Sequence, residues 1–261
     1  MFTCNAKEIE RSDGSHVVLP EKVGWTSGIV NLMHRLKTDM YIIALFPLFF
    51  SSNYFFPYQL NDINLAVFNV RTRALNNTLF WASEIPGAYA AGCALDMRFL
   101  SRPARVKAAL GALLFIVMSI WGGGYAWQTK YTRPQTASPD FIKVDLTDPE
   151  YIGPMFLMIA YGFFDGVWQT SIYWFMGALA DNSSTASVAD FAGFFKSLQS
   201  VGAAVAWKLN NLNSPFLVDL SVTWGILVGS LLCAAPMLMA KIKDTNVIDG
   251  EKQEYNEERD G

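Results

Sequence analysis

The charged residues of this 261-residue chain are unevenly spread, and several long stretches carry no charge at all. One stretch lies between Asp39 and Asp62 and has 22 residues, and another runs from Ala108 to Trp127. An α-helix needs about 20 mainly apolar residues to cross the hydrocarbon core of a bilayer. Only 16% of the residues are charged, against roughly 25% in an ordinary soluble protein. The charge-free stretches therefore predict an integral membrane protein.

Six apolar segments can be delimited in this way, and we expect each to form a transmembrane helix. Their approximate ranges are 40–60, 75–96, 107–127, 152–180, 190–209 and 217–240. Strands are not expected, because open strands leave backbone groups unpaired in lipid and the segments lack the alternation of a membrane barrel. The predicted fold is an all-α membrane protein whose six transmembrane helices occupy residues 39–241, with a kink at Pro47 in the first helix.

The distribution of Lys and Arg predicts the orientation, because cytoplasmic loops are enriched in these residues. One side carries 13 of them, in residues 1–38, the loop after the second span and the tail, and the other side carries 5. Both termini are therefore expected in the cytoplasm. Residues 1–38 would include an amphipathic helix over 21–38, or else a simple linker, and residues 242–261 would form an acidic tail. Plasma membrane and endomembranes are not distinguished.

The composition also excludes several functional classes. Three cysteines, two of them within apolar spans, predict neither a disulfide framework nor a metal site. The two histidines lie in the N-terminal stretch and support no hydrolase constellation. The net charge of −3, with no basic face, argues against nucleic acid as a partner. We expect no enzyme, cofactor or metal site, and the lipid bilayer is the first expected partner.

Ionisable side chains within a span are candidate functional residues, because they are costly in lipid unless paired or hydrated. Glu84, in the second span, could bind a cation or a proton, or it could pair with Lys196 for packing alone. Lys196, in the fifth span, could line a cavity or extend its ammonium group to the lipid headgroups. Asn53, in the first span, is a further candidate for a cavity-lining position.

Asp165 lies midway along the fourth span, and Gln169 follows one helical turn later. Together they form a polar stripe on an apolar helix, which should face the bundle interior or a water-filled cavity. Gly162 and Gly166 have the spacing of a close helix–helix contact. The stripe could therefore bind an ion or solute, or it could serve helix association alone.

The loop after the second span contains Asp96 and Arg98, followed by Arg102. It resembles the glycine-aspartate-arginine signature that major facilitator proteins carry between the second and third helices of each half, although the second glycine is missing. A carboxylate at a helix end that faces arginines could act as a cytoplasmic latch between two helices. An ordinary loop enriched in positive charge is the alternative.

Four further segments carry a more specific resemblance: NY at 53–54 with YQLND at 58–62, FNVRTRALNN at 68–77, YGFFD at 161–165 and AGFFKSLQS at 192–200. They resemble the fungal branch of the Unc-93-like family, whose members are membrane proteins of the major facilitator type. The resemblance covers roughly residues 20–242. It implies a major-facilitator-like half bundle that corresponds to the C-terminal six helices of a twelve-helix protein.

The resemblance implies a solute transporter or a regulator of ion flux. Asp165 and Glu84 would be its proton or cation sites. Transporters of this type bind substrate between two halves, so the chain would need a second half-transporter or a second copy of itself, or it is a fragment of a longer protein. The alternative is a non-transporting adaptor or chaperone that binds other membrane proteins. Substrate, coupling ion and transport direction are not predicted.

Overall fold

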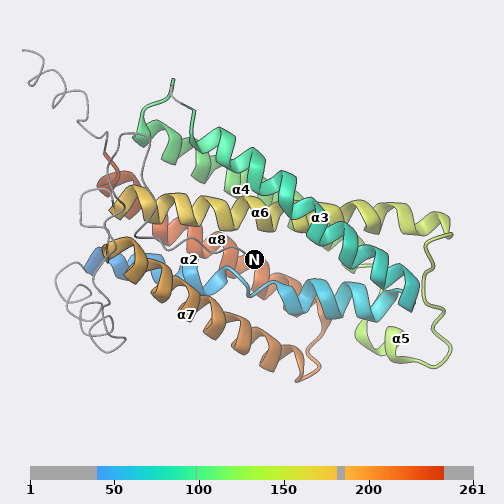
Figure 1. Ribbon diagram of the computed structural model, residues 1–261. Helices are drawn as coiled ribbons and strands as arrows, with labels where there is room; N and C mark the ends of the chain where they lie inside the picture. Colours follow the sequence, from blue (N-terminus) through green and yellow to red (C-terminus); the bar gives the residue numbers. More distant parts are fainter. Residues whose placement is uncertain (1–39, 98, 181–185, 244–261) are drawn as a thin grey trace, which may run out of the picture.

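The computed structural model of the protein describes residues 40–97, 99–180 and 186–243, and Figure 1 shows their arrangement. The predicted amphipathic segment at 21–38, the acidic tail beyond residue 243 and Arg98 lie outside the described residues.

The described residues are helical apart from the connections between helices and an isolated backbone bridge between Phe68 and Val144. This part of the chain confirms the all-α prediction. In chain order the elements are a 3-10 helix (Met40–Leu45), α2 (Phe46–Ser51), a π-helix (Tyr58–Leu65), α3 (Val70–Leu95), α4 (Arg102–Gln128), α5 (Arg133–Ala137), a 3-10 turn (Pro149–Tyr151), α6 (Ile152–Ala180), α7 (Ala186–Asn210) and α8 (Phe216–Lys241).

Five of the six predicted spans correspond closely to single long helices, α3, α4, α6, α7 and α8, whereas the first, 40–60, is divided among a 3-10 helix, α2 and part of the π-helix. Within the described residues, α4 and α8 are long and apolar enough to cross a membrane by length and composition. Six crossings of the bilayer therefore stay a prediction.

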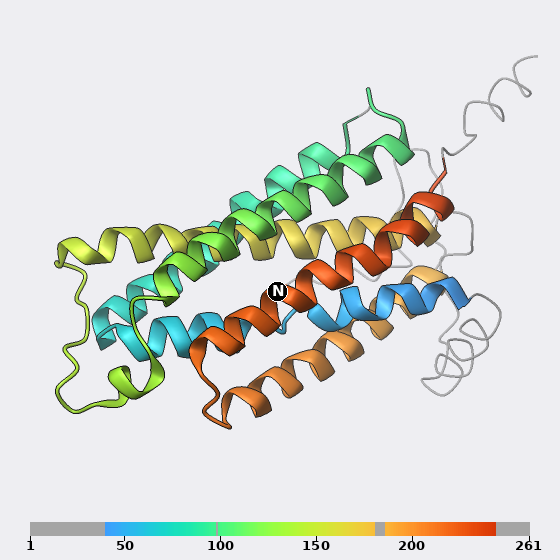
Figure 2. The ribbon, with the colours of Figure 1, turned by 180° about the vertical axis from the view of Figure 1, so that it is seen from behind.

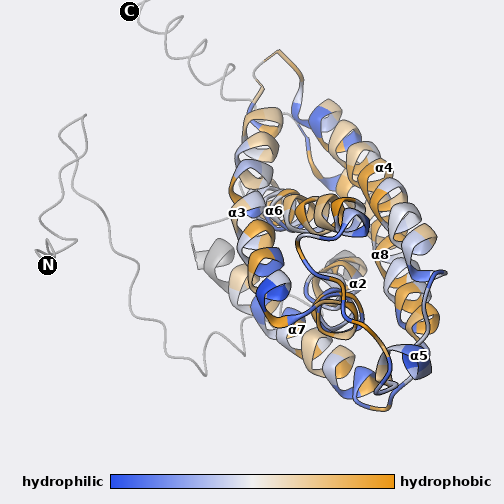
Figure 3. Ribbon diagram, turned by 90° about the vertical axis from the view of Figure 1, so that its right-hand side faces the viewer, coloured by the Kyte–Doolittle hydropathy of each residue, from blue (hydrophilic) through white to orange (hydrophobic). Residues whose placement is uncertain are grey.

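The long helices run back and forth along one axis, as Figures 1 and 2 show. The 3-10 helix at the start of the described chain and the last turn of α8 lie at the same end, and α5 lies at the opposite end, which we call the α5 end. Seen along the axis, α4 and α8 lie on one side and α3 and α7 on the other (Figure 3). α6 contacts α3, α4 and α7, while α2 contacts α7 and α8.

The first helical segment is broken at residues 52–55, between α2 and the π-helix. Pro47 lies in the first turn of α2, directly after the 3-10 helix, where its missing N–H is tolerated, and the predicted kink at this residue stays a prediction. Pro57 follows the break. It has no N–H to donate to the carbonyl four residues earlier, at Asn53, so the helix cannot continue regularly through this point.

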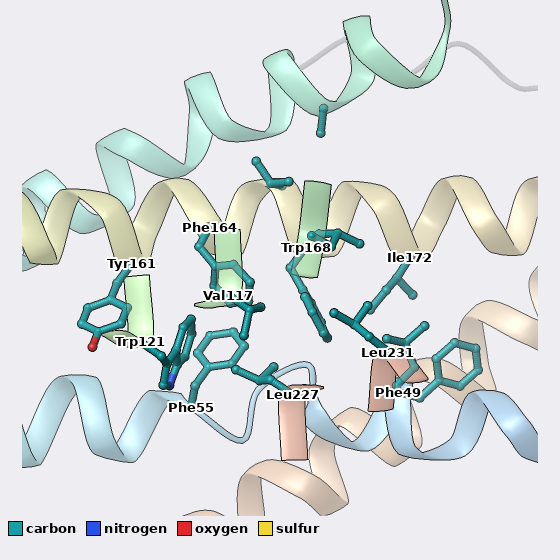
Figure 4. Packing of buried hydrophobic residues seen from close by; sticks show 14 of the residues in the cluster. Phe49, Phe55, Val117, Trp121, Tyr161, Phe164, Trp168, Ile172, Leu227 and Leu231 are labelled. Carbon is teal, nitrogen blue, oxygen red and sulfur yellow. The ribbon is translucent and has the colours of Figure 1, made fainter. Parts of the chain in front are cut away.

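Aromatic side chains fill the centre of the bundle (Figure 4). Phe55, Trp121 and Phe164 are fully buried and bring together the first segment, α4 and α6. Their rings meet edge to face, with centroids 5.5 Å apart for Phe55 and Phe164 and 4.8 Å apart for Trp121 and Phe164. Aromatic pairs prefer this geometry because the positive ring edge meets the negative ring face. These contacts hold the broken segment against the long helices.

Glycines allow α3 and α6 to pack with their backbones almost in contact. A Cβ atom on Gly162 would lie 2.0 Å from the Phe80 carbonyl oxygen, and one on Gly166 would lie 2.2 Å from the Glu84 carbonyl oxygen. From the other helix, a Cβ on Gly87 would lie 2.2 Å from the Phe163 carbonyl oxygen. The predicted close helix–helix contact at Gly162 and Gly166 is therefore present, and its partner is α3.

Candidate functional site

A polar cluster lies near the middle of the bundle and contains four of the five sequence-predicted cavity residues. We call it the central polar cluster; its members are Asn53, Asp165, Gln169, Lys196 and Gln199. Asp165 is close to the midpoint of α6, and Lys196 and Gln199 flank the midpoint of α7. Asn53 lies in the break of the first segment. If the helices span a bilayer, these side chains lie near its midplane.

Hydrogen bonds connect the cluster from a carboxylate to an ammonium group. Gln169 Nε2 donates to Asp165 Oδ1 at 3.1 Å and to Asn53 Oδ1 at 3.1 Å. Gln199 Nε2 donates to Asn53 Oδ1 and to Gln169 Oε1, both at 3.0 Å. Lys196 Nζ then donates to Gln199 Oε1 at 2.8 Å. The two amides thus bridge a negative and a positive side chain that do not touch.

The broken helix takes part directly in this site. Ser52 lies in the break, and Gln169 Nε2 lies 3.0 Å from its carbonyl oxygen, so the two N–H groups of this amide are shared among Ser52, Asn53 and Asp165. Trp168 Nε1 donates to the Ser52 hydroxyl at 3.1 Å. Irregular backbone at membrane depth is tolerated only where protein buries it or where it lines a cavity. α6 therefore supplies the groups that satisfy the break.

The two charged members of the cluster differ in burial. Asp165 is 2% exposed, whereas the Lys196 side chain is exposed on α7. The Lys196 ammonium lies over the rings of Tyr173 and Phe195, at 5.5 and 5.1 Å from their centroids. Its hydrogen bond to Gln199 directs it away from the nearer end of α7. In this structure Lys196 belongs to the cluster and does not extend toward that helix end.

Glu84 lies close to the cluster without joining its hydrogen bonds. It is half-buried near the middle of α3, and its carboxylate interacts electrostatically with Lys196 and with Asp165. Glu84 and Lys196 attract each other across the α3–α7 side of the bundle, but the described residues form no ion pair between them, so the predicted pairing is not made as a direct contact. A lysine and two carboxylates near mid-height are a suitable set for a proton or a small cation.

The predicted latch lies where α3 ends and α4 begins. Asp96 is exposed at the C-cap of α3, and Arg102 is the first residue of α4. A contact that joins these helix ends comes from Arg105, whose Nη1 donates to the Leu95 carbonyl at 2.8 Å. Arg98 lies outside the described residues, so the latch stays a prediction.

A second charged group, at the α5 end, was not predicted. We call it the α5-end charge cluster; its members are Asp62, Arg133, Asn210 and Asp219. Arg133 Nη2 donates to Asp62 Oδ1 at 2.9 Å and to Asp219 Oδ2 at 3.0 Å. Asn210 Nδ2 donates to Asp62 Oδ1 at 2.8 Å. One arginine thus joins the first segment, α5 and α8, and α7 contributes the amide.

The sequence contained a weak signal for this cluster. Asp62 ends the first charge-free stretch and Asp219 opens the last helix, positions at which a charge is ordinary. Asp62 is nevertheless fully buried, and a buried carboxylate needs a partner. The partner, Arg133, comes from a connecting loop, so its proximity depends on the folded arrangement of four segments.

Comparison with known proteins gives the chain its relatives. It is 39% identical over 245 residues to an UNC93-like protein of Schizosaccharomyces pombe, covering 94% of this chain and 48% of that protein. It is 34% identical over 243 residues to UNC93-like protein 1 of Arabidopsis thaliana, covering 92% of this chain and 52% of that protein. An uncharacterized membrane protein of Schizosaccharomyces pombe is 26% identical over 243 residues.

No family model matches the chain, and no solved structure matches it. The chain spans about half the length of the curated relatives it matches. The sequence resemblance identified above is thus confirmed at the level of the family, and the relatives support a membrane protein. With identity of 34 to 39% across almost its whole length, the chain belongs to the UNC93-like family.

Proposed function

We propose that the chain forms one six-helix half of a major-facilitator-like membrane protein, and that the central polar cluster lines its pathway for a solute or an ion. The observation that carries this proposal is the hydrogen-bonded connection between Asp165 and Lys196 near the middle of α6 and α7. Secondary transporters bind substrate near the midplane, beside discontinuous helices. The break at residues 52–55 adjoins the cluster and has this character.

The exposure of the cluster supports the need for a second half. Lys196 is exposed on α7 and Glu84 is half-buried on α3, and neither charge is stable against lipid tails. The side of the bundle that carries α3 and α7 would therefore face water or protein. In the proposed assembly, a second half-transporter, a second copy or the remainder of a longer chain covers it. The length of the relatives agrees with this arrangement.

In the proposed mechanism, Asp165 binds the proton or cation and the two glutamine amides orient its carboxylate. Protonation or cation binding would neutralise Asp165 and remove its attraction for Lys196 across the amides. The helix bundles could then rock against each other. The latch at Asp96, Arg98 and Arg102 would close the end that we place in the cytoplasm, together with both termini. Regulation of ion flux by the same residues belongs to this proposal.

A flux measurement tests the role of Asp165. The purified protein is reconstituted in liposomes, and proton entry is followed with a trapped pH-sensitive dye while a valinomycin-set potassium gradient drives it. Asp165→Asn should abolish the flux, because it keeps the shape of the side chain and removes its charge. Asp140→Asn, an exposed loop acid of the same type, is the matched control and should retain it. Equal flux in Asp165→Asn and the native protein would refute the proposed role.

The alternative function, an adaptor that binds other membrane proteins, would need a free surface for its partner. The glycine stripe of Gly162 and Gly166 does not supply this surface, because α3 packs against it within the fold. Partner binding would have to use the exposed side of α3 and α7. Co-purification of a partner that is lost in Lys196→Leu, with no flux in the native protein, would favour the adaptor.

A further inference from the structure

A cavity of about 800 Å³ opens at the α5 end, separate from the central polar cluster. Three cationic side chains line it, Arg73, Arg133 and Lys143, and no Asp or Glu is among its lining residues. Four asparagines from the α3 start and the α7–α8 connection, together with Asn61, line it as well. This is the composition of a site for a negatively charged ligand.

Arg73 and Lys143 carry positive charges that the described part of the chain does not neutralise. The ion pairs formed there involve Arg71 and Arg133, not these two residues. Lys143 Nζ donates to the carbonyls of Ala66 and Thr136, which uses two of its three N–H groups. The ammonium also lies 5.1 Å from the centroid of the Phe141 ring, so it has carbonyl and ring contacts but no carboxylate partner among the described residues. The half-buried guanidinium of Arg73 forms no ion pair there either.

The two cations also repel each other. Partial burial, followed by the nearby charge of Arg73, lowers the pKa of the Lys143 ammonium below its ordinary value. Holding like charges together at the mouth of a cavity is unfavourable unless a counter-charge occupies the space between them. A ligand with negative charge would relieve this repulsion.

The unpaired cations of the wall indicate where the charges of the ligand would lie. Arg133, the third cation, is paired with both Asp62 and Asp219, so it offers no positive charge to a ligand. Arg73 and Lys143 form no ion pair within the described residues, and each can meet one anionic group. The wall also contains the N-terminal start of α3, at Asn69 and Val70, where the helix dipole favours negative charge. Asparagine amides add neutral donors around the edge.

We propose that this cavity, called here the α5-end basin, binds a dianion that carries carboxylate or phosphate oxygens. Arg73 would grip it with a planar guanidinium, which suits both oxyanions, and Lys143 would supply the second charge. The basin is wide and open, so a dissolved anion can enter it directly. The inference does not depend on the proposed transport role of the central polar cluster.

Binding of inorganic phosphate and succinate tests the proposal. The full protein is placed in phosphatidylcholine nanodiscs, and calorimetric titrations are run at pH 7.4 and constant ionic strength, with acetate as the monoanion. Phosphate and succinate should compete for a single site and bind at least tenfold more tightly than acetate. If phosphate binding is lost in nanodiscs that contain phosphatidic acid, the phosphate headgroup of this lipid occupies the basin. This result would support the same chemistry and identify a lipid headgroup as the ligand.

Variants locate the site. Arg73→Gln and Lys143→Gln should each weaken succinate binding about tenfold or more, because each removes a charge-assisted hydrogen bond. Arg71→Gln is the matched control: this arginine lies two residues from Arg73 but is 61% exposed and pairs with Asp145 outside the basin. The affinity of the Arg71→Gln variant for succinate should stay within about twofold of the native value. Unchanged thermal unfolding in all three variants keeps the comparison valid.

Two results would overturn the proposal. The first is the absence of saturable binding by either dianion, or equal affinity for succinate and acetate. The second is a loss of binding in Arg71→Gln as large as that in Arg73→Gln, which would indicate a general attraction to the positive end of the molecule. Misfolding of Lys143→Gln would leave Arg73→Gln as the deciding variant, because the Arg73 side chain forms no ion pair in the described structure.

Discussion

The contact between α3 and α6 gives a sharp prediction for Gly162→Ala. The added Cβ would lie 2.0 Å from the Phe80 carbonyl oxygen and 2.4 Å from Ser83 Oγ. Ordinary van der Waals contact begins near 3.4 Å, so the two backbones must separate by more than one ångström at this point. Because Gly166 and Gly87 make equally close contacts, a local shift would disturb the whole packed surface.

Overpacking of this kind costs about 1–3 kcal/mol, and the helix propensity of alanine returns about 1 kcal/mol of that cost. We therefore expect Gly162→Ala to be destabilised by up to about 2 kcal/mol net. Gly177→Ala, on the same helix, is the matched control, because a Cβ there meets nothing within 4 Å. It should be neutral or stabilised by up to about 1 kcal/mol.

The assay is unfolding in mixed micelles of mild detergent and increasing sodium dodecyl sulfate, followed by tryptophan fluorescence. Buried Trp121 and Trp168 make the signal sensitive to the packing of α6. The difference between Gly162→Ala and Gly177→Ala isolates the steric effect, since helix propensity is common to both. Equal stability of the two variants would refute the proposed close packing of α3 against α6.

Two further predictions use the same unfolding measurement. Arg133→Met should lower the free energy of unfolding by about 3–5 kcal/mol, because it leaves the carboxylates of Asp62 and Asp219 without their cation. A loss below about 1 kcal/mol, which is typical of an exposed ion pair, would show that the α5-end charge cluster is hydrated. Arg71 holds the pKa of the Asp145 carboxyl well below its ordinary value. The pair therefore stabilises the protein fully above about pH 4, the ordinary pKa of an aspartate. This stabilisation is lost as the pH falls through the pKa that Asp145 has in the folded protein. The stability difference between the native protein and Asp145→Asn should therefore be present at pH 7 and shrink in acid, and a difference that grows in acid would contradict this sign.

The helices of this protein could be predicted from its sequence because their apolar residues form long uninterrupted runs. The candidates Asp165, Gln169 and Lys196 could also be predicted, since a polar side chain within such a run is conspicuous. The sequence did not predict that these side chains meet, because the rotation of each helix about its axis depends on contacts such as that of Gly162 with Phe80. The hydrogen bonds of Gln199 became visible only once α6 and α7 were placed side by side.

The break in the first segment and the α5-end charge cluster were missed for different reasons. Pro47 and Pro57 have the same local chemistry, but Pro47 occupies the first turn of a helix, where it is tolerated. The position at which α2 begins therefore determines which of the two prolines interrupts the helix. Asp62 and Arg133 form a pair that depends on the path of the loop after α4, which hydropathy does not describe.

The central claim is that the side of the bundle carrying α3 and α7 borders a water-filled path and that the opposite side faces lipid. In a variant without native cysteines, Lys196→Cys on α7 and Phe115→Cys on α4, where Phe115 is 72% exposed, are treated with a water-soluble maleimide in intact membranes. Lys196→Cys should react at least tenfold faster, because thiols react as thiolates and these form in water. Equal rates at the two positions, or faster reaction at Phe115→Cys, would contradict the claim.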